Sequence, residues 1–191
     1  MSVATESTVA FGDFDPNALI AQLSSADEIE PGHLPNESGV YAVYIRRDSF
    51  ADLLSAGPGD VLYVGQSRNL AERDHVTHRH SGFSTLRRSI GAVFLEKWEG
   101  RALRRAPGAS ETNWRNFRFD DVTEARLTDW IRQNLVFRYV RCPIERLSVV
   151  EECAITALEP LMNINGWRNP RGGDLKSARR KCAEMARLRA P

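Results

Sequence analysis

Two short β-strand patterns, separated by fifteen residues, constrain the fold of this chain more than any other feature. The segments GVYAVYI (39–45) and VLYVG (61–65) have the β-branched and aromatic content of strands. A link of fifteen residues is short for the crossover that joins parallel strands, so we expect an antiparallel pair. LVFRYVRC (135–142) alternates like a third strand. The sequence therefore predicts an α+β fold, a small antiparallel sheet of about three strands flanked by helices.

The rest of the chain is predominantly helical in pattern. Apolar residues at three- and four-residue steps, or capping residues, predict helices at 15–23, 69–80 (with a frayed end), 84–98, 123–135, 143–158 and 174–188. Asp15 before Pro16 and Ser84 are typical N-caps. Thr123 and Asp174 are expected to begin two further helices. The last helix, at the C-terminus, carries a continuous apolar stripe.

A length of 191 residues suits one domain with an arm. We predict three parts. Residues 1–38 form an acidic N-terminal arm with a short helix. Residues 39–165 form the core, with insertions near 46–60 and 99–120. Residues 166–191 form a basic, helical C-terminal extension.

The formal net charge of +1 conceals a strong asymmetry along the chain. Residues 1–45 hold seven acidic and no basic residues, whereas 66–105 hold nine basic and four acidic ones. Residues 164–191 hold eight basic and two acidic ones. This division indicates a polyanionic partner, although solvated helix faces give similar runs. We expect the basic segments to face phosphate and the acidic arm to lie away from it.

Several classes of protein lack support in the sequence. No apolar run approaches the roughly 18 residues of a membrane span, and the first residues do not resemble a signal peptide. Three cysteines without a paired pattern favour a reducing cytoplasm. There is no glycine-rich phosphate loop, HExxH or GxSxG motif. The histidines at 75, 78 and 80 have no matching ligands for a structural zinc site.

Five polar residues in three ordered blocks point to a specific chemistry. Tyr41 ends GVY and Tyr63 begins YVG, and Arg73 follows ten residues later in GQSRNLAER. Glu151 lies nine residues before Pro160 and twelve before Asn163. Each feature alone is common, but the combination, from about Gly39 to Asn163, resembles the GIY-YIG nuclease family.

The resemblance implies roles for these residues. Glu151 corresponds to the metal-binding glutamate, Arg73 to the catalytic arginine, and Gly39 and Gly65 to the motif glycines. One carboxylate suffices for Mg²⁺ or Mn²⁺, which keeps several waters, and arginine stabilises charge on a phosphoryl group. We expect Tyr41 to act as general base, provided that its pKa is lowered, and Tyr63 to orient water or phosphate. The two roles can be exchanged. Asn163 is expected to hold the carboxylate and its loop.

The chain departs from compact members of that family in its long connections. The 21 residues from Ala42 to Leu62 and the expanded stretch between Arg73 and Glu151 are similar to the restriction-endonuclease branch, whose members dimerise on duplex DNA. That branch also carries a histidine after the arginine, for which His75, His78 and His80 are candidates. Arg87 or Arg88 is a rival for the catalytic arginine, and Arg88 is a candidate accessory residue.

The leading hypothesis is a Mg²⁺-dependent endonuclease that cuts duplex DNA as a homodimer, in the manner of a type II restriction enzyme. The alternatives are a structure-specific repair or recombination nuclease and a binding module that has lost catalysis. RNA is a weaker substrate candidate because no aromatic platform for single strands is evident. Candidate DNA-contacting residues are Arg68, Arg87, Arg104, Arg105, Arg168 and Arg171. Trp114 and Trp167 are either part of this surface or packing residues.

Overall fold

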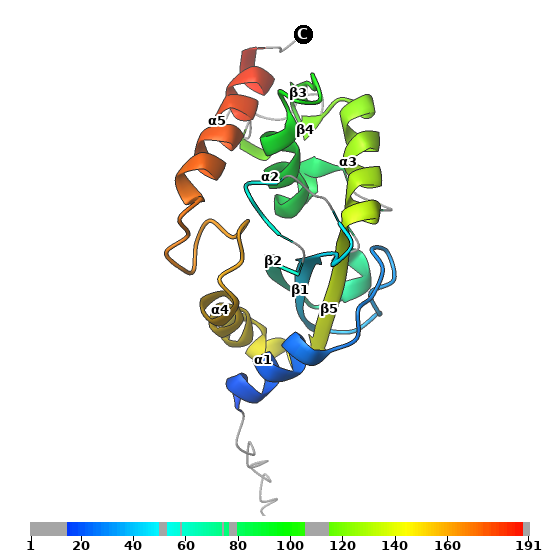
Figure 1. Ribbon diagram of the computed structural model, residues 1–191, viewed down its shortest axis with the longest axis vertical. Coiled ribbons are helices and arrows are strands. Elements are labelled where there is room, and N and C mark those ends of the chain that lie inside the picture. Colours follow the sequence, from blue (N-terminus) through cyan, green and yellow to red (C-terminus); the bar gives the residue numbers. More distant parts are fainter. Residues whose placement is uncertain are drawn as a thin grey trace, which may run out of the picture.

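The computed structural model describes residues 15–49, 53–57, 59–73, 75–76, 80–105 and 115–188. It contains an antiparallel three-stranded sheet in the order β2-β1-β5 (Figure 1). The strands are β1 (Gly39–Ile45), β2 (Val61–Ser67) and β5 (Leu135–Arg141). Helices flank this sheet, so the predicted α+β class, the three strands and their antiparallel pairing are confirmed.

Strand β1 is central and every one of its residues is buried. Its side chains alternate between two hydrophobic cores. Tyr41 and Val43 belong to one core, and Val40 and Ala42 belong to the other. A central strand that is covered on both faces reads as a continuous apolar run, as GVYAVYI does.

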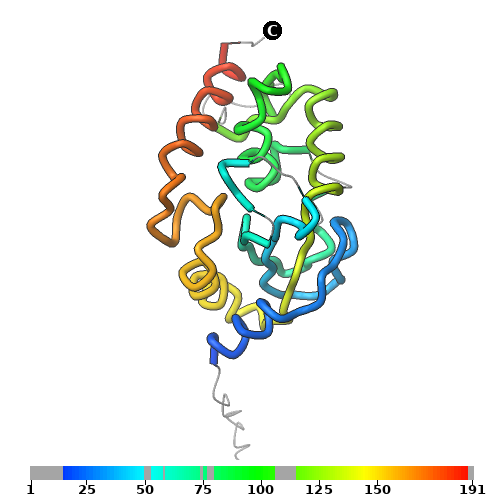
Figure 2. Tube along the Cα trace, viewed as in Figure 1, coloured from blue at the N-terminus to red at the C-terminus, as the bar shows by residue number. Residues whose placement is uncertain are grey.

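In the part of the chain that the structure describes, five α-helices enclose the two cores. Helices α1 (Pro16–Ser25) and α4 (Leu147–Leu158) pack on each other and on the core that contains Val40 (Figure 2). The core that contains Tyr41 is built with α2 (Thr85–Phe94), α3 (Asp121–Asn134) and α5 (Gly172–Leu188), at the other end of the molecule in Figure 1. None of the helices in the described ranges has the length and apolar character needed to cross a membrane.

The helix starts agree with the sequence at two caps and differ at two others. Asp15 Oδ1 accepts from the Asn17 amide at 2.8 Å, and Ser84 caps α2 as predicted. Helix α3 is capped by Asp120, whose carboxylate accepts from the Thr123 amide at 2.8 Å, so the predicted start at Thr123 is wrong by two residues. Helix α5 begins at Gly172, which places Asp174 in the first turn instead of at the cap.

The predicted helix at 69–80 is wrong. Only the 3₁₀ turn η1 (Leu70–Arg73) forms, and His75 has a φ of +57°, in the left-handed region that ends helices. A second 3₁₀ turn, η2 (Ser81–Phe83), follows. Before α4 the predicted start at Pro143 is also replaced by a 3₁₀ turn, η4 (Ile144–Arg146).

Part of the predicted insertion 99–120 belongs to the core. Strand β3 (Ala102–Leu103) pairs antiparallel with β4 (Arg118–Phe119). Phe117 and Phe119 are buried in the same core as Tyr41. Trp114 lies outside the described residues, so its predicted role is untested.

Three acidic residues of the predicted N-terminal arm form ion pairs with arginines of the same chain. The pairs are Glu28 with Arg138, Glu30 with Arg46, and Glu37 with Arg141. The backbone of Ile29 also pairs with Phe137 of β5. This end of the acidic segment is therefore attached to the edge of the sheet formed by β5.

Candidate active site

The two tyrosines are placed by the β1–β2 pairing. Tyr41 lies opposite Gly65 and Tyr63 lies opposite Val43, so that their ring centroids are 6.2 Å apart. A Cβ atom at Gly65 would lie 2.6 Å from the Tyr41 hydroxyl oxygen and 2.9 Å from the Tyr63 ring. Only glycine at this position lets both rings cross β2 where they do.

Tyr41 and His75 form a buried hydrogen-bonded pair. The Tyr41 hydroxyl lies 2.9 Å from His75 Nε2, and His75 Nδ1 lies 2.9 Å from Ser84 Oγ. Burial raises the pKa of Tyr41 well above 10. Burial, with the charges of Arg73 and Arg87, lowers the pKa of His75 to about 3. Both groups are therefore neutral at pH 7, and a proton on Nδ1 leaves Nε2 to accept from the tyrosine.

Glu151 projects from α4 to the edge of strand β2. Its Oε2 accepts a hydrogen bond from Gln66 Nε2 at 2.7 Å. Burial raises the pKa of the half-buried Glu151, whereas the Gln66 hydrogen bond and the charge of Arg73 oppose that rise. A nearby cation stabilises the ionised form of a carboxylate that is partly buried in this way.

The donors around Glu151 fit a divalent ion that retains water. Within the described residues, no three histidine, cysteine or acidic side chains cluster as metal ligands. Gln66 donates to Oε2 of Glu151, and the two carboxylate oxygens have further lone pairs with which to bind a cation. One carboxylate with water and a substrate phosphate is the ligand set that Mg²⁺ commonly takes.

Asn163 completes the edge of strand β2. The amides of Leu161 and Met162 donate to the carbonyls of Val61 and Leu62 at 3.1 and 2.8 Å. Asn163 then continues this ladder with its side chain, accepting from the Val64 amide and donating to the Val64 carbonyl, both at 2.9 Å. The residue fixes the strand between Tyr63 and Gly65. The expected bond from Asn163 to the Glu151 carboxylate is wrong, because its amide is used on the backbone.

Arg73 lies at the end of η1, half-buried, and its charge acts on the other polar residues of the site. The cation opposes the rise in the pKa of Tyr41, of Tyr63 and of Glu151, and it contributes to the low pKa of His75. Burial, followed by the charge of Glu151, raises the pKa of Tyr63. The structure therefore places Tyr41, Tyr63, Arg73 and Glu151 within electrostatic range of one another, and Asn163 bonds the backbone of Val64, next to Tyr63.

The two rival arginines differ from Arg73. Arg87 is 2% exposed, pairs with Glu124 at 2.7 Å and donates to the His75 carbonyl at 2.6 Å. The prediction that Arg87 contacts DNA is therefore wrong, because its guanidinium is inside the protein. Arg88 is 7% exposed and donates to the carbonyls of Ser81 and Gly82. Burial and the neighbouring charge of Arg179 lower the pKa of Arg88 to about 10, while Tyr63 opposes that shift.

The remaining candidates have separate surroundings. His80 Nδ1 accepts from the Gly82 amide at 3.1 Å and caps η2, whereas His78 lies outside the described residues. Trp167 packs against the core that contains Val40 and donates to the Pro160 carbonyl at 3.1 Å, so it is a packing residue.

The other predicted DNA-contacting arginines vary in exposure and in their partners. Arg68 and Arg168 are exposed, Arg104 is half-buried, Arg105 stacks on Phe83, and Arg171 pairs with Asp174 and donates to Ser55. Arg68 and Arg168 are therefore the most accessible of this set.

Two polar residues of the site were absent from the sequence-based assignment. Gln66 forms a hydrogen bond with Glu151. Ser84 was identified only as a helix cap, but it also forms a hydrogen bond with His75. Strand alternation offers a signal for Gln66, because residues 64 and 66 point to the same face of β2. The contact between Ser84 and His75 has no such signal.

Two tyrosines on a small sheet, with an arginine and a carboxylate from neighbouring segments, supply the groups that a metal-assisted phosphodiester hydrolase needs. The family model of the GIY-YIG catalytic domain matches residues 39–189. The chain belongs to this family and is an endonuclease, a phosphodiester hydrolase. The match extends through α5, beyond the stretch on which the resemblance was based. No curated protein and no solved structure matches the chain at a significant level.

Proposed function

We propose that the protein hydrolyses phosphodiester bonds in duplex DNA and depends on Mg²⁺, with Mn²⁺ as a substitute. The observation that carries this proposal is the meeting of Arg73 and Glu151 beside two tyrosines. Arg73 acts electrostatically on both tyrosines and on Glu151. A guanidinium beside a single carboxylate suits a phosphate and a hydrated divalent ion.

Each residue has a defined part in this proposal. Arg73 binds the scissile phosphate and stabilises the charge that develops on it. Glu151, held by Gln66, is the protein ligand of the divalent ion. When bound, that ion neutralises phosphate charge and assists departure of the 3′ oxygen. Asn163 keeps Tyr63 in place through the Val64 backbone.

Tyr41 acts as general base only if its own proton has an acceptor, because its pKa is raised by burial. His75 Nε2, at 2.9 Å, is that acceptor. Burial is the main cause of the low pKa of His75, and the charge of Arg73 lowers it further. A phosphodiester anion paired with Arg73 offsets its positive charge, so the pKa of His75 rises. Water then gives its proton to Tyr41 as the Tyr41 proton moves to His75.

The finer assignment is a type II-like restriction endonuclease that acts as a homodimer. This assignment is supported by the long connections between the two tyrosine motifs and between Arg73 and Glu151. Strands β3 and β4 lie in the second of these connections. A repair or recombination nuclease is the alternative substrate class. A binding module without catalysis is disfavoured, because binding alone requires neither Glu151 nor a tyrosine bonded to a neutral histidine.

The test is cleavage of supercoiled plasmid, linear duplex, branched DNA and single-stranded RNA by the purified protein. We expect cleavage of duplex DNA with Mg²⁺ or Mn²⁺ and none with EDTA. Discrete fragments support the restriction assignment, and preferential cutting of flaps or junctions supports the repair assignment. Salt-sensitive DNA binding without cleavage in either metal would contradict the proposed activity.

A further inference from the structure

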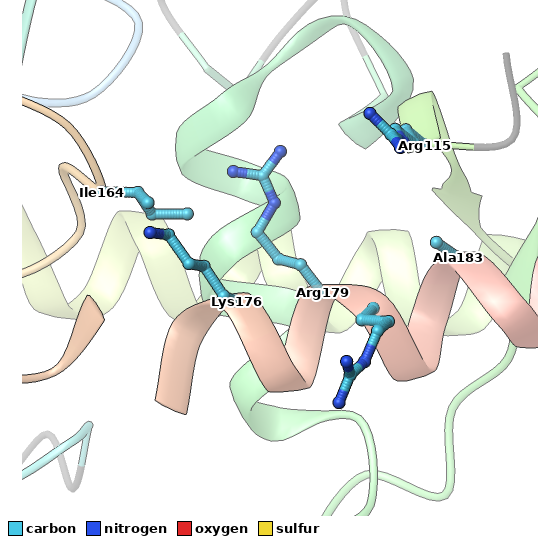
Figure 3. A pocket seen from close by; sticks show the side chains of 6 residues that line it. Arg115, Ile164, Lys176, Arg179 and Ala183 are labelled. Carbon is cyan, nitrogen blue, oxygen red and sulfur yellow. The ribbon is translucent and has the colours of Figure 1, made fainter. Parts of the chain in front are cut away.

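A pocket of about 360 Å³ lies along α5, on a surface that the catalytic assignment does not use. Its cationic lining residues are Arg115, Lys176, Arg179 and Arg180, and Ile164 and Ala183 supply apolar wall (Figure 3). In Figure 3 the side chain of Arg179 extends from α5 toward α2, and Lys176 lies beside Ile164. Four cations around one cavity indicate an anionic ligand.

Three of these cations lack the counter-charges that other basic residues have. Lys181, on the same helix, pairs with Glu96 at 3.0 Å, and Arg171 pairs with Asp174 at 3.6 Å. By contrast, within the described ranges no carboxylate lies within ion-pairing distance of Lys176, Arg179 or Arg180. Cations gathered without acids repel one another, so an anion that enters the pocket stabilises all of them.

One lining residue of the pocket, Arg179, lies within electrostatic range of Tyr63 in the active site. Burial lowers the pKa of Arg179, and the nearby Tyr63 opposes that shift. After burial, the charge of Arg179 lowers the pKa of Arg88 further, and Tyr63 opposes that shift. The Nε of Arg88 is buried without a hydrogen-bond partner in the described structure. The charges of Arg88, Arg179, Arg73 and Glu151 all act on Tyr63, which places the cationic pocket within electrostatic range of the active site.

We propose that this pocket binds a backbone phosphate of the DNA strand next to the scissile phosphate, with Arg179 and Arg180 as its main contacts. The inference rests on the proposed function and specifies how that site takes its substrate. Arginine forks suit phosphate oxygens. Ile164 and Ala183 offer an apolar wall to the adjoining sugar. A second phosphate contact fixes the register of the strand, so that one particular bond lies at Tyr41 and Arg73.

The experiment measures DNA affinity against salt concentration in a Glu151→Gln background without divalent metal, so that cleavage plays no part. The test variant is Arg179→Gln/Arg180→Gln, and the control is Lys181→Gln, one residue further on the same helix. Loss of one phosphate contact lowers the slope of log K against log[salt] by about 1. We expect that change in the test variant and none in the control, with equal melting temperatures.

A second arm locates the phosphate. Single methylphosphonate substitutions along the substrate remove one charge at a time. We expect one position beside the cut to weaken binding of the parent protein by about tenfold and to have no further effect in Arg179→Gln/Arg180→Gln. Equal salt slopes in all three proteins, or additive losses at every position, would overturn the proposal. Competition of inorganic phosphate with DNA at the pocket, without any sensitive position, would assign it to a free anion and also overturn it.

This design separates the pocket from the proposed activity. DNA binding with the expected change in slope but no cleavage by the wild-type protein contradicts the activity alone. Cleavage by the wild-type protein with unchanged slopes contradicts the pocket alone. An absence of DNA binding at every salt concentration contradicts both.

Discussion

The hydroxyl of Tyr41 lies 2.9 Å from Nε2 of His75, inside the core and at the centre of the candidate active site. Tyr41 is 2% exposed and His75 is 7% exposed. Burial keeps both groups uncharged, since it raises the pKa of the phenol and lowers that of the imidazole. Tyr41 therefore depends on His75 to accept its proton. The buried, neutral His75 also makes the free energy of unfolding depend on pH.

His75 makes the fold sensitive to acid. Its pKa is about 3 in the folded protein against a usual 6.5, so the unfolded chain binds more protons between these values. Stability therefore falls as the pH decreases from 6.5 toward 3, and His75 contributes a loss of about 2 kcal/mol between pH 7 and pH 5. His75→Asn should lose this contribution while tolerating the positive φ at this position. Urea unfolding at the two pH values measures it.

The exposed His33 provides the matched control for that experiment. His33→Asn should retain the full difference between pH 7 and pH 5. An identical difference in His75→Asn and the parent protein would show that His75 is not buried as a neutral group.

Gln66 sets the pH at which Glu151 becomes a usable ligand. The hydrogen bond from Gln66 lowers the pKa of Glu151, which burial raises above 4.5. Gln66→Leu removes the bond, so the pKa rises further and the acidic limb of the pH–rate profile moves to higher pH. Single-turnover cleavage at subsaturating Mg²⁺ measures the limb. Ser148→Ala removes only the 3.3 Å contact to Gln66 and should leave the limb in place; a shift to lower pH in Gln66→Leu would contradict this account.

Asn163 contributes to stability through the backbone of Val64. Asn163→Ala leaves a buried amide and a buried carbonyl without their partners, at a cost of about 2–4 kcal/mol. The neighbouring Asn165 is exposed, and Asn165→Ala should change the free energy of unfolding by less than about 0.5 kcal/mol. Chemical denaturation of the two variants compares them directly. Equal stabilities would mean that Asn163 does not hold the edge of β2.

Arg73 and Arg87 should separate catalysis from folding. Arg73→Gln removes a half-buried charge at the site, and we expect a loss in rate of about 10² or more with little change in stability. Arg87→Gln removes the ion-pair partner of the largely buried Glu124, which then keeps only its hydrogen bonds from Ser81 and Phe119, and should cost about 3 kcal/mol of stability. Single-turnover cleavage and urea unfolding of both variants test the distinction. The reverse pattern would make Arg87 the catalytic arginine.

The fold was largely predictable because its signals are local. The strands around Tyr41 and Tyr63 follow from β-branched content, and the caps at Asp15 and Ser84 follow from side chains that bond the next turn. The helix predicted at 69–80 fails because His75 adopts a left-handed backbone and points its ring at Tyr41. That choice is made by tertiary contacts and is not encoded in helical periodicity.

Sequence patterns propose identities for the site residues but not the partners that hold them. Family spacing marks Arg73, Glu151 and Asn163, but it does not show that Asn163 bonds the Val64 backbone or that Gln66 bonds Glu151. Asn163 and Val64 are 99 residues apart in the sequence, and Gln66 and Glu151 are 85 residues apart. The same holds for β3 and β4, whose two-residue strands are too short to leave a pattern.

Cleavage by Glu151→Gln, compared with Glu152→Gln, tests the central claim most directly. The two glutamates are adjacent on α4, but Glu151 is half-buried against Gln66 and Glu152 is exposed. With duplex DNA and saturating Mg²⁺ we expect Glu151→Gln to lose at least about 10² in single-turnover rate. Glu152→Gln should cut as the wild-type protein does, and both should bind DNA and unfold normally. Undiminished Mg²⁺-dependent cleavage by a folded Glu151→Gln protein would contradict the account.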